Sequence, residues 1–361
     1  MSDKKFISGR ALQIVLIALF LALSLLPSLG MIVFGPSESS ANEILASKPA
    51  IIAKDGRFNK NILSDVSDYI ADRFAFRQSF VTAWSRLNAA VFRSSAEEQV
   101  VLGKNGWLYY TPSVDDYMGR AMSVDELKHA AAYLASLQQT AESRGAAFVF
   151  TIAPNKNSLY AQNMPSYIPE DHNASNAERL KPWLDEYGVN YVDLFSVFSE
   201  RGEVLYYRTD SHWTERGAAL AADALLQAAD RPSSYFDGPF AAGEGHRGDL
   251  YEMLYPKGKE LEENELYMPG FSYTLRDDPN GGNAMRIRSL CDGRDGTLLC
   301  WRDSFGISLY PYLADSFGSA TFLRSANYDP AMIDKTGASV VLVEIVERNL
   351  TQLAEAEIIV N

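Results

Sequence analysis

The strongest constraint in this sequence is an uncharged stretch near its start. Residues 11–34 (ALQIVLIALFLALSLLPSLGMIVF) contain no charged side chain, and they follow a short segment that holds Lys4, Lys5 and Arg10. A helix of about 20 apolar residues crosses a bilayer, whereas the apolar core of a secretory signal has about 7–15. The stretch therefore predicts a transmembrane signal-anchor rather than a buried core helix. A signal peptide cleaved at the small residues 39–41 is the alternative.

The charges around this stretch predict the orientation of the chain. Basic residues beside a membrane span stay in the cytoplasm, so we expect a cytoplasmic N-terminus and an extracytoplasmic remainder, anchored in the cell membrane by one helix. The predicted organisation is a basic cap (1–10), the anchor (11–34), a linker (35–57) and one extracytoplasmic domain (58–361). Residues 231–285 of that domain are richer in Gly, Pro and charge and predict an irregular insertion.

Composition limits what the extracytoplasmic part can do. Of the 361 residues, 47% are hydrophobic, which is ample for a full core. The formal net charge of −13 argues against a nucleic-acid partner, because phosphate binding needs a basic surface. Two cysteines and four histidines leave little room for a zinc module or a histidine-built metal centre, so we expect no cofactor and no metal.

Continuous apolar runs alternate with helical patterns along the domain. The runs predict buried strands at residues 146–153, 190–194, 297–303, 321–324 and 339–344. The helical patterns lie at residues 58–93, 123–144, 174–187 and 214–229, and residues 100–110 predict a hairpin. In the second helix, Ser123 and Glu126 have the spacing of a capping box. This alternation predicts an α/β fold with a mostly parallel sheet covered by helices on both faces.

Two polar residues at strand and helix junctions are candidates for catalysis. Ser304 lies where a predicted strand turns into a helix, which exposes a hydroxyl and places a backbone N–H at a helix N-terminus. The alternative is a serine that only caps the helix. His212 follows Asp210 by two residues at another helix entrance, and Trp213 could shield its ring from water. A capping aspartate with a partly buried histidine is the alternative there.

Metal binding is the weaker interpretation of this motif. Asp210 and His212 supply two ligands, but the other histidines, His129, His172 and His246, lie in unrelated helical or loop segments.

An ordered set of motifs makes the assignment more specific. Lys-Asn-Gly-Trp-Leu-Tyr (104–109), Pro-Asn-Lys (154–156), Asp-Ser-His-Trp (210–213) and Asp-Ser-Phe (303–305) follow one another. In this order they resemble the alginate O-acetyltransferase AlgX/AlgJ-like proteins, also called the DHHW family, over about residues 58–350.

The resemblance implies a fold, a reaction and a set of site residues. The fold is an SGNH-hydrolase-like α/β domain, and the reaction is O-acetylation of a polysaccharide outside the cytoplasmic membrane. The family pattern makes Ser304 the nucleophile, and His212 and Asp210 complete its triad. An expected partner, besides the polysaccharide acceptor, is a multi-spanning membrane acyltransferase that delivers the acyl group.

Two features depart from the usual SGNH pattern. The position before Asp-Ser is usually Gly but is Arg302 here, which either alters the turn or places a cation near the site. The acid and base are spaced Asp-x-His rather than Asp-x-x-His, which is typical of the resembled family.

Other residues have weaker signals. Asn155 or Lys156 could donate to an oxyanion or simply form a polar loop, and Tyr310 could line the pocket or pack in the core. Cys291 and Cys300 either form a disulfide, which an extracytoplasmic location permits, or remain buried free thiols.

The sequence therefore predicts an extracytoplasmic serine O-acyltransferase that modifies a cell-surface or exported polysaccharide. A carbohydrate esterase with the same triad and a non-catalytic, membrane-anchored scaffold remain as alternatives.

Overall fold

The computed structural model describes residues 9–38, 45–53, 55–171, 173–268, 270–277 and 284–359. The chain divides into an N-terminal unit, formed by residues 1–97 and 251–259, and a sheet unit, formed by residues 98–250 and 260–361. Lys4, Lys5, the small residues 39–41 and His172 lie outside the described residues.

The N-terminal unit is helical. Its helices are α1 (Gly9–Phe34), α2 (Ile62–Arg73) and α3 (Arg77–Phe92). Among the residues that the structure describes, α1 is the one helix long and apolar enough to cross a membrane, so the predicted apolar helix is confirmed. The predicted helical stretch 58–93 is two helices, because the chain breaks at Phe76, which has a positive φ of 65°.

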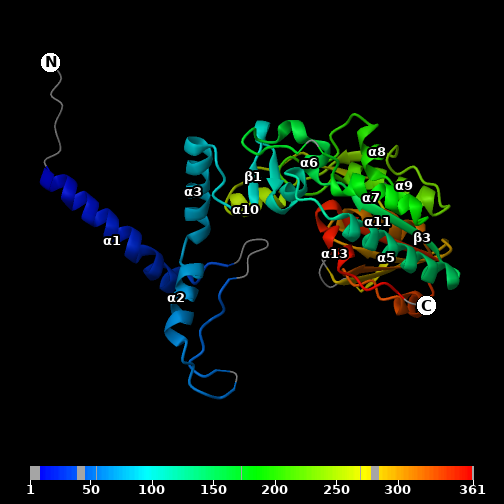
Figure 1. Cartoon of the computed structure of the whole chain (residues 1–361). Coiled ribbons are helices and arrows are strands. Elements are labelled where there is room, and N and C mark those ends of the chain that lie inside the picture. The colour runs from blue at the N-terminus through cyan, green and yellow to red at the C-terminus, as the bar shows by residue number, and fades with distance from the viewer. Residues whose placement is uncertain are drawn as a thin grey trace. The chain divides into compact units, whose positions relative to one another are not determined.

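A seven-stranded sheet organises the sheet unit (Figure 1). Its strands, in spatial order, are β4 (Tyr191–Val192), β3 (Ala147–Ala153), β11 (Val340–Val346), β9 (Thr297–Arg302), β10 (Ser319–Arg324), β8 (Arg286–Leu290) and β7 (Thr274–Asp277). The first five run parallel, whereas β8 is antiparallel to both of its neighbours. The carboxyl ends of β3, β9 and β11 therefore lie at one edge of the sheet.

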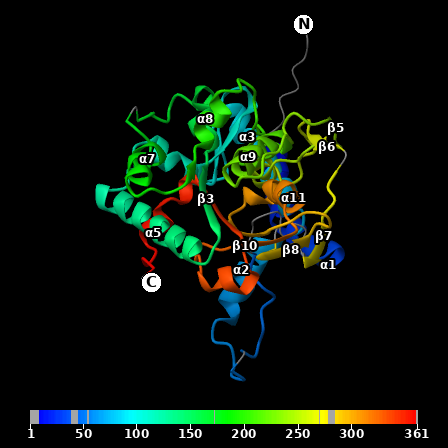
Figure 2. The same cartoon turned by 90° about the vertical axis from the view of Figure 1, so that its right-hand side faces the viewer.

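Helices cover both faces of the sheet. The longer ones are α5 (Val124–Ser143), α7 (Asn176–Glu186), α9 (Glu215–Ala228) and α11 (Gly306–Ser316), and the shorter ones are α4 (Val114–Tyr117), α6 (Lys156–Leu159), α8 (Leu194–Ser199), α12 (Ala331–Thr336) and α13 (Thr351–Ala354). In Figure 2, α5 and α7 lie on one side of β3, and α9 and α11 lie on the other. The capping box of Ser123 and Glu126 opens α5 as predicted.

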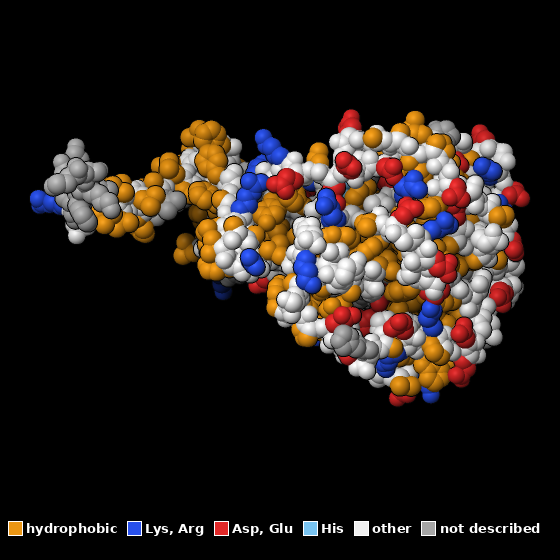
Figure 3. Space-filling model, turned by 90° about the horizontal axis from the view of Figure 1, so that it is seen from above, with side chains coloured by type: hydrophobic (Ala, Val, Ile, Leu, Met, Phe, Trp, Pro, Cys, Tyr) orange, Lys and Arg blue, Asp and Glu red, His pale blue; other side chains and the backbone are white. Residues whose placement is uncertain are grey.

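The two faces of the central strands feed two separate cores. Along β11, Val340, Leu342 and Val346 pack with α9 and α11, whereas Val341 and Val343 pack with α5 and α7. This alternation explains the continuous apolar runs in the sequence, because strands covered on both faces have no polar side. The mostly parallel α/β sheet is confirmed. In the space-filling view, acidic and basic side chains are mixed over the sheet unit, and hydrophobic side chains line α1 (Figure 3).

Two smaller sheets complete the unit. Strands β1 (Val100–Leu102) and β2 (Leu108–Tyr110) form the predicted antiparallel hairpin. Within residues 231–285, β5 (Phe240–Ala242) pairs with β6 (Glu265–Tyr267), and β7 extends the main sheet. Helix α10 spans Asp249–Leu254, and its residues from Tyr251 on belong to the N-terminal unit. The stretch predicted as an irregular insertion thus contains short regular elements.

The cysteines stay apart because of the strand order. Cys291 and Cys300 are both buried free thiols. Cys291 directly follows β8, and Cys300 lies in β9. Because β10 lies between these two strands, the segments with the thiols are separated by two strand spacings of about 4.8 Å each. A disulfide needs Cα atoms within about 7 Å of each other. Of the two alternatives that the sequence left open, the structure has the free thiols.

Candidate active site

Ser304 lies on a turn that is tied to the neighbouring strand. The turn joins the end of β9 to the start of α11, and Asp303 holds it in place. The backbone N–H of Asp303 donates to Glu344 of β11 at 3.1 Å, and the Asp303 carboxylate accepts the N–H groups of Val346 at 2.7 Å and Phe305 at 2.9 Å. Hydrogen bonds of Asp303 to β11 and to Phe305 thus fix the chain on either side of the nucleophile candidate.

Asp210 and His212 lie in the loop that precedes α9. The loop closes where Tyr206 and Trp213 form an isolated bridge, and Thr214 then caps the helix by accepting from the N–H of Gly217. One carboxylate oxygen of Asp210 accepts both the ring N–H of His212 (Nδ1, 2.7 Å) and its backbone N–H (2.9 Å). The Asp-x-His spacing allows this double contact, because the short turn folds the carboxylate back onto the next residue but one.

The two motifs meet at the carboxyl edge of the sheet. The Nε2 atom of His212 lies 2.9 Å from the Ser304 hydroxyl, although the residues are 92 positions apart in the chain. With the Nδ1 proton directed at Asp210, Nε2 is free to accept the hydroxyl proton. The three side chains therefore have the connectivity of a serine, histidine and aspartate triad.

Electrostatics favour charge separation within this triad. Burial alone would raise the pKa of the Asp210 carboxyl, but hydrogen bonds and charge from His212 and His246 hold that pKa well below its usual range. Burial alone would lower the pKa of His212, but its hydrogen bond to Asp210 and the Asp210 charge raise it above the usual value. An anionic aspartate that raises the basicity of histidine is the arrangement a general base needs.

His246 is the site residue that the sequence reasoning missed. Its Nε2 lies 2.8 Å from the second carboxylate oxygen of Asp210, and its ring stacks on Tyr207 with centroids 3.9 Å apart. The backbone N–H of Asp249 donates to the same oxygen at 2.9 Å. The prediction that His246 lies in an unrelated segment is therefore wrong, because the insertion folds back onto the triad. A single histidine in a segment without helical or strand periodicity gives no local indication of such a contact.

Asp249 also organises the loop that carries Asp210 and His212. Ser211 donates its hydroxyl to one Asp249 oxygen at 2.6 Å and its backbone N–H to the other at 2.7 Å. Ligand-type atoms of Asp210, His212 and Asp249 lie within 4.8 Å of one another, a spacing that suits a metal ion. A metal there would take His212 Nδ1 away from Asp210, so metal binding and the triad would compete for the same atom.

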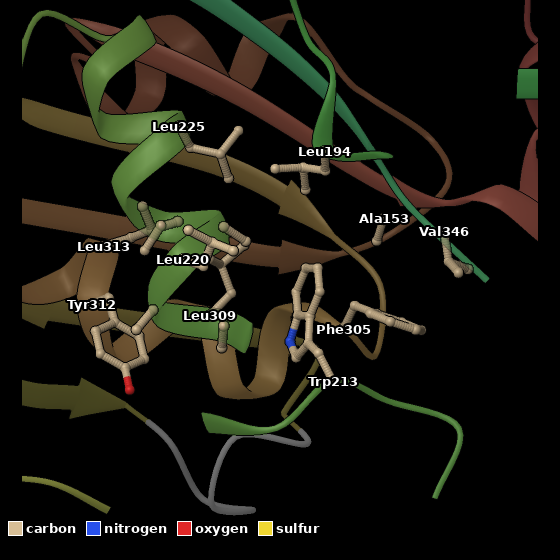
Figure 4. Close-up of a cluster of buried hydrophobic side chains, with 14 of the residues drawn as sticks. Ala153, Leu194, Trp213, Leu220, Leu225, Phe305, Leu309, Tyr312, Leu313 and Val346 are labelled. Atoms are coloured by element: carbon tan, nitrogen blue, oxygen red, sulfur yellow. The ribbon is translucent and has the colours of Figure 1, made fainter. Parts of the chain in front are cut away.

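Trp213 packs between the site and the hydrophobic core. Its indole N–H donates to the Ser308 hydroxyl of α11 at 3.0 Å, and its ring packs edge-on against Phe305 at 4.9 Å. Phe305 in turn lies 4.8 Å from the His212 ring. Figure 4 shows Trp213 and Phe305 side by side in the buried cluster, next to α11. The nucleophile turn and the histidine loop are thus locked together by packing.

Lys156 holds the backbone of the histidine loop. Its ammonium, almost fully buried, donates to the carbonyl oxygens of Tyr207 (3.1 Å), Arg208 (2.9 Å) and Asp210 (2.6 Å). Burial lowers the pKa of Lys156 to about 7, although nearby acids oppose the shift. Since all three N–H bonds are directed at the loop, the oxyanion role considered for Lys156 has no free donor in this arrangement.

The side-chain amide of Asn155, unlike the ammonium of Lys156, makes no hydrogen bond to the described residues. Its side chain is only 1% exposed, and neither its amide nitrogen nor its oxygen has a hydrogen-bond partner among the described residues. Its backbone N–H is fixed by Glu347, which follows β11, at 2.8 Å. Asn155 follows β3 at the same sheet edge as Ser304, so an unused amide donor lies at the edge that carries the nucleophile.

Arg302 and Tyr310 serve the fold around the turn. The Arg302 guanidinium is buried and donates to the carbonyls of Asp303 and Ala284, each at 3.0 Å. Its stem crosses Gly306 so closely that a Cβ there would lie 2.4 Å from it. Arg302 stands where SGNH proteins usually have Gly, and its guanidinium is directed into the turn, where it binds backbone carbonyls. Tyr310 is half-buried and packs on Phe322 at 5.6 Å, as a core aromatic does.

Comparisons with known proteins point to one family. Residues 100–271 match the family model of the SGNH hydrolase-like domain of acetyltransferase AlgX. The probable alginate O-acetylase AlgJ of Pseudomonas syringae pv. tomato is 26% identical over 220 residues, which are 60% of this chain and 52% of that protein. The probable alginate O-acetylase AlgJ of Pseudomonas fluorescens is 25% identical over 280 residues, which are 72% of this chain and 66% of that protein. The chain thus spans about half the length of the first of these relatives.

Solved structures share the fold. A DHHW family protein from Eubacterium siraeum superposes with a TM-score of 0.53 at 20% identity, covering 73% of this chain and 99% of its own. Bacillus cereus PatB1, solved with a sulfonyl adduct, superposes with a TM-score of 0.52 at 18% identity, covering 70% of this chain and 95% of its own. The predicted resemblance is confirmed: residues 100–271 match the SGNH hydrolase-like domain model of acetyltransferase AlgX, and the chain is similar in sequence to AlgJ proteins.

Proposed function

We propose that this protein is a serine O-acyltransferase that moves an acyl group onto hydroxyls of a polysaccharide outside the cytoplasmic membrane. The observation that carries the proposal is the chain of contacts from Ser304 to His212 at 2.9 Å and from His212 to Asp210 at 2.7 Å. The names of the relatives, which are alginate O-acetylases, support an acetyl group and an alginate-like acceptor.

The first half-reaction loads the enzyme. The Ser304 oxygen attacks the carbonyl carbon of the acyl donor while His212 Nε2 takes the hydroxyl proton. The proton then passes from His212 to the leaving group of the donor, and an ester bond to Ser304 remains. Asp210 stays ionised throughout and stabilises the cationic imidazole, as its lowered pKa allows.

The second half-reaction transfers the group. A sugar hydroxyl attacks the Ser304 ester while His212 takes its proton, and that proton returns to the Ser304 oxygen as the acyl group leaves. The side-chain amide of Asn155 and the backbone N–H of Ser304 are the donors that would hold the oxyanion in both steps. Water in place of the sugar would make the same site an esterase.

The proposed location follows from α1. A single apolar helix behind the basic N-terminus would keep the sheet unit on the extracytoplasmic side of the membrane. An acyl donor for such an enzyme has to be delivered across or within the membrane, which is consistent with a multi-spanning acyltransferase as partner.

Labelling and product analysis test the proposal. A sulfonyl fluoride should add one sulfonyl group to the wild-type chain and none to Ser304→Ala, while Ser143→Ala, a control on the remote helix α5, should label normally. With p-nitrophenyl acetate and an alginate oligosaccharide, the wild type should release p-nitrophenol and produce an acetylated oligosaccharide. Free acetate alone would assign an esterase, and full labelling of Ser304→Ala would refute the triad.

A further inference from the structure

Helix α2 carries an apolar face that the described residues leave exposed. None of its residues is buried, and Leu63, Val66 and Ile70 are exposed by 38% to 84%. At 100° per residue these three side chains fall within an arc of about 60°. The acids Asp65, Asp68 and Asp72 fall on the opposite side of the helix. Helix α2 therefore separates an apolar face from an acidic one along its whole length.

Helix α3 continues the pattern with a longer stripe. Phe80, Trp84, Leu87 and Val91 follow one another at steps of four, three and four residues and are exposed by 44% to 60%. The opposite side of α3 is the one that packs on protein, since Thr82 is buried there and accepts the Lys257 N–H at 3.0 Å. The stripe therefore points away from the rest of the N-terminal unit. We call these four side chains, with the three of α2, the apolar stripe.

The junction of the two helices rests on α1 inside its apolar stretch. The Ala75 N–H donates to the carbonyl of Pro27 at 3.2 Å, and the rings of Phe34 and Phe76 lie 5.3 Å apart. Pro27 precedes the end of α1 at Phe34 by seven residues, which is about 10 Å along a helix axis. If α1 spans the bilayer, the α2–α3 junction lies within the outer leaflet and not above it.

The charges of α3 suit a lipid surface. From residue 77 to residue 93 the chain has three basic residues, Arg77, Arg86 and Arg93, and no acid. Helices that lie in a membrane interface combine Trp, Phe and Leu on the buried face with cations near the headgroups. Trp84 belongs to the stripe itself, and Trp favours the boundary between headgroups and acyl chains.

We propose that α2 and α3 lie in the outer leaflet of the cytoplasmic membrane, with the apolar stripe among the acyl chains and the arginines of α3 near anionic headgroups. The inference rests on α1 as the membrane anchor and is independent of the chemistry assigned to Ser304. Its consequence is a membrane attachment that includes a surface layer in addition to the single span, and that restrains the orientation of the chain at the bilayer.

Site-specific fluorescence on the full chain tests this placement. An environment-sensitive dye is attached to Ile70→Cys and to Leu87→Cys, and Asp68→Cys provides the matched control on the polar face of α2. The native thiols are buried, so the wild-type chain measures background labelling. Each labelled protein is reconstituted in vesicles of phosphatidylethanolamine and phosphatidylglycerol, and thermal melting confirms that each variant folds.

The expected result is a blue-shifted emission at positions 70 and 87 that nitroxides near the top of the acyl chains quench, with water-like emission at position 68. Water-like emission at both stripe positions in these vesicles would overturn the placement. Shielding that appears only in native membranes, and not in the pure lipid, would also overturn it and would assign the stripe to a membrane protein. Loss of sulfonyl labelling at Ser304 would leave this readout unchanged, so the two proposals fail separately.

Discussion

The contact between His246 and Asp210 offers the sharpest test of how the site works. Asp210 is 5% exposed, and its second oxygen accepts from His246 Nε2 at 2.8 Å and from the Asp249 N–H at 2.9 Å. Replacing His246 by Ala leaves that oxygen with one donor. A hydrogen bond to a charged group contributes about 1.5–3 kcal/mol, and 1.36 kcal/mol corresponds to a tenfold change in rate. If the loss falls on the transition state, kcat should drop by about 10- to 150-fold.

The variant should also change the pH profile. His246 is one of the two groups that hold the pKa of Asp210 low, so its removal raises that pKa. With one donor fewer, the Asp210 carboxylate also accepts more strongly from His212 and raises the basicity of its ring. The low-pH limb of activity, where His212 takes up a proton, should then move to higher pH. The stability that the depressed pKa contributes is present above the unfolded-state pKa and is lost as pH falls, so His246→Ala should also lower the unfolding free energy near neutral pH.

Steady-state hydrolysis of p-nitrophenyl acetate between pH 4 and 9 measures both effects at about unit pH steps. His246→Gln keeps an N–H donor at a similar reach and should recover most of kcat. If His246 had a purely structural role, His246→Ala would lower the melting temperature but would not shift the low-pH limb of the activity profile. Unchanged kcat and an unchanged acid limb in His246→Ala would refute the idea that this histidine positions the triad.

Further outcomes follow from single contacts. Asn155→Ala should lower kcat by about 100- to 1000-fold with little change in KM, as loss of an oxyanion donor does, and equal kcat would exclude it from that role. Lys156→Met should lower the unfolding free energy by about 3 kcal/mol in a chemical denaturation experiment, because three buried carbonyls lose their donor, and Lys156→Arg should restore only part. Burial raises the pKa of Glu347 to about 8 from 4.5, so the folded state holds the proton between these values and unfolding free energy should fall as pH rises through that window; Glu347→Gln should flatten this dependence. Denatured protein should react with two equivalents of iodoacetamide without reductant, at Cys291 and Cys300, and a blocked pair would show a disulfide instead.

Local sequence patterns predicted the central elements well. The runs that became β3, β9 and β11 are mostly apolar, as strands covered on both faces require, and their polar positions include Thr151, Arg302 and Glu344. Helices filled the segments between these strands. Ser304 and His212 were singled out because each lies at a junction next to a helix, and in the structure those junctions meet. The parallel order of the sheet makes this meeting possible, since it collects strand ends at one edge.

Long-range contacts were beyond the same patterns. His246 reaches Asp210 from a stretch without helical or strand periodicity, so its position depends on how the insertion packs. Strands β8 and β9 follow each other in the chain but do not pair with each other, because β10 from further along the chain pairs with both of them. The break at Phe76 inside a helical pattern likewise follows from packing on Pro27 and Phe34 in α1 and not from a Pro or Gly in the sequence.

Three of the four motifs converge on one buried cation, which explains why they act as a set. Trp107 and Tyr109 of the first motif place their rings 5.6 and 5.2 Å from the ammonium of Lys156, which comes from the second. That ammonium donates to three carbonyls of the loop that carries Asp210 and His212, the third motif. Three acceptors around one nitrogen need three N–H bonds in a pyramidal arrangement, which an ammonium has and a planar guanidinium lacks. The aromatic rings add to the stabilisation of the charge that Asp210, Asp249 and Glu262 provide at longer range, and none of these groups takes one of the three N–H bonds from the loop carbonyls. A lysine beside two aromatic rings thus fixes the loop backbone through its three N–H bonds, while the contacts among Asp210, His212 and His246 determine the charge of the Asp210 carboxylate.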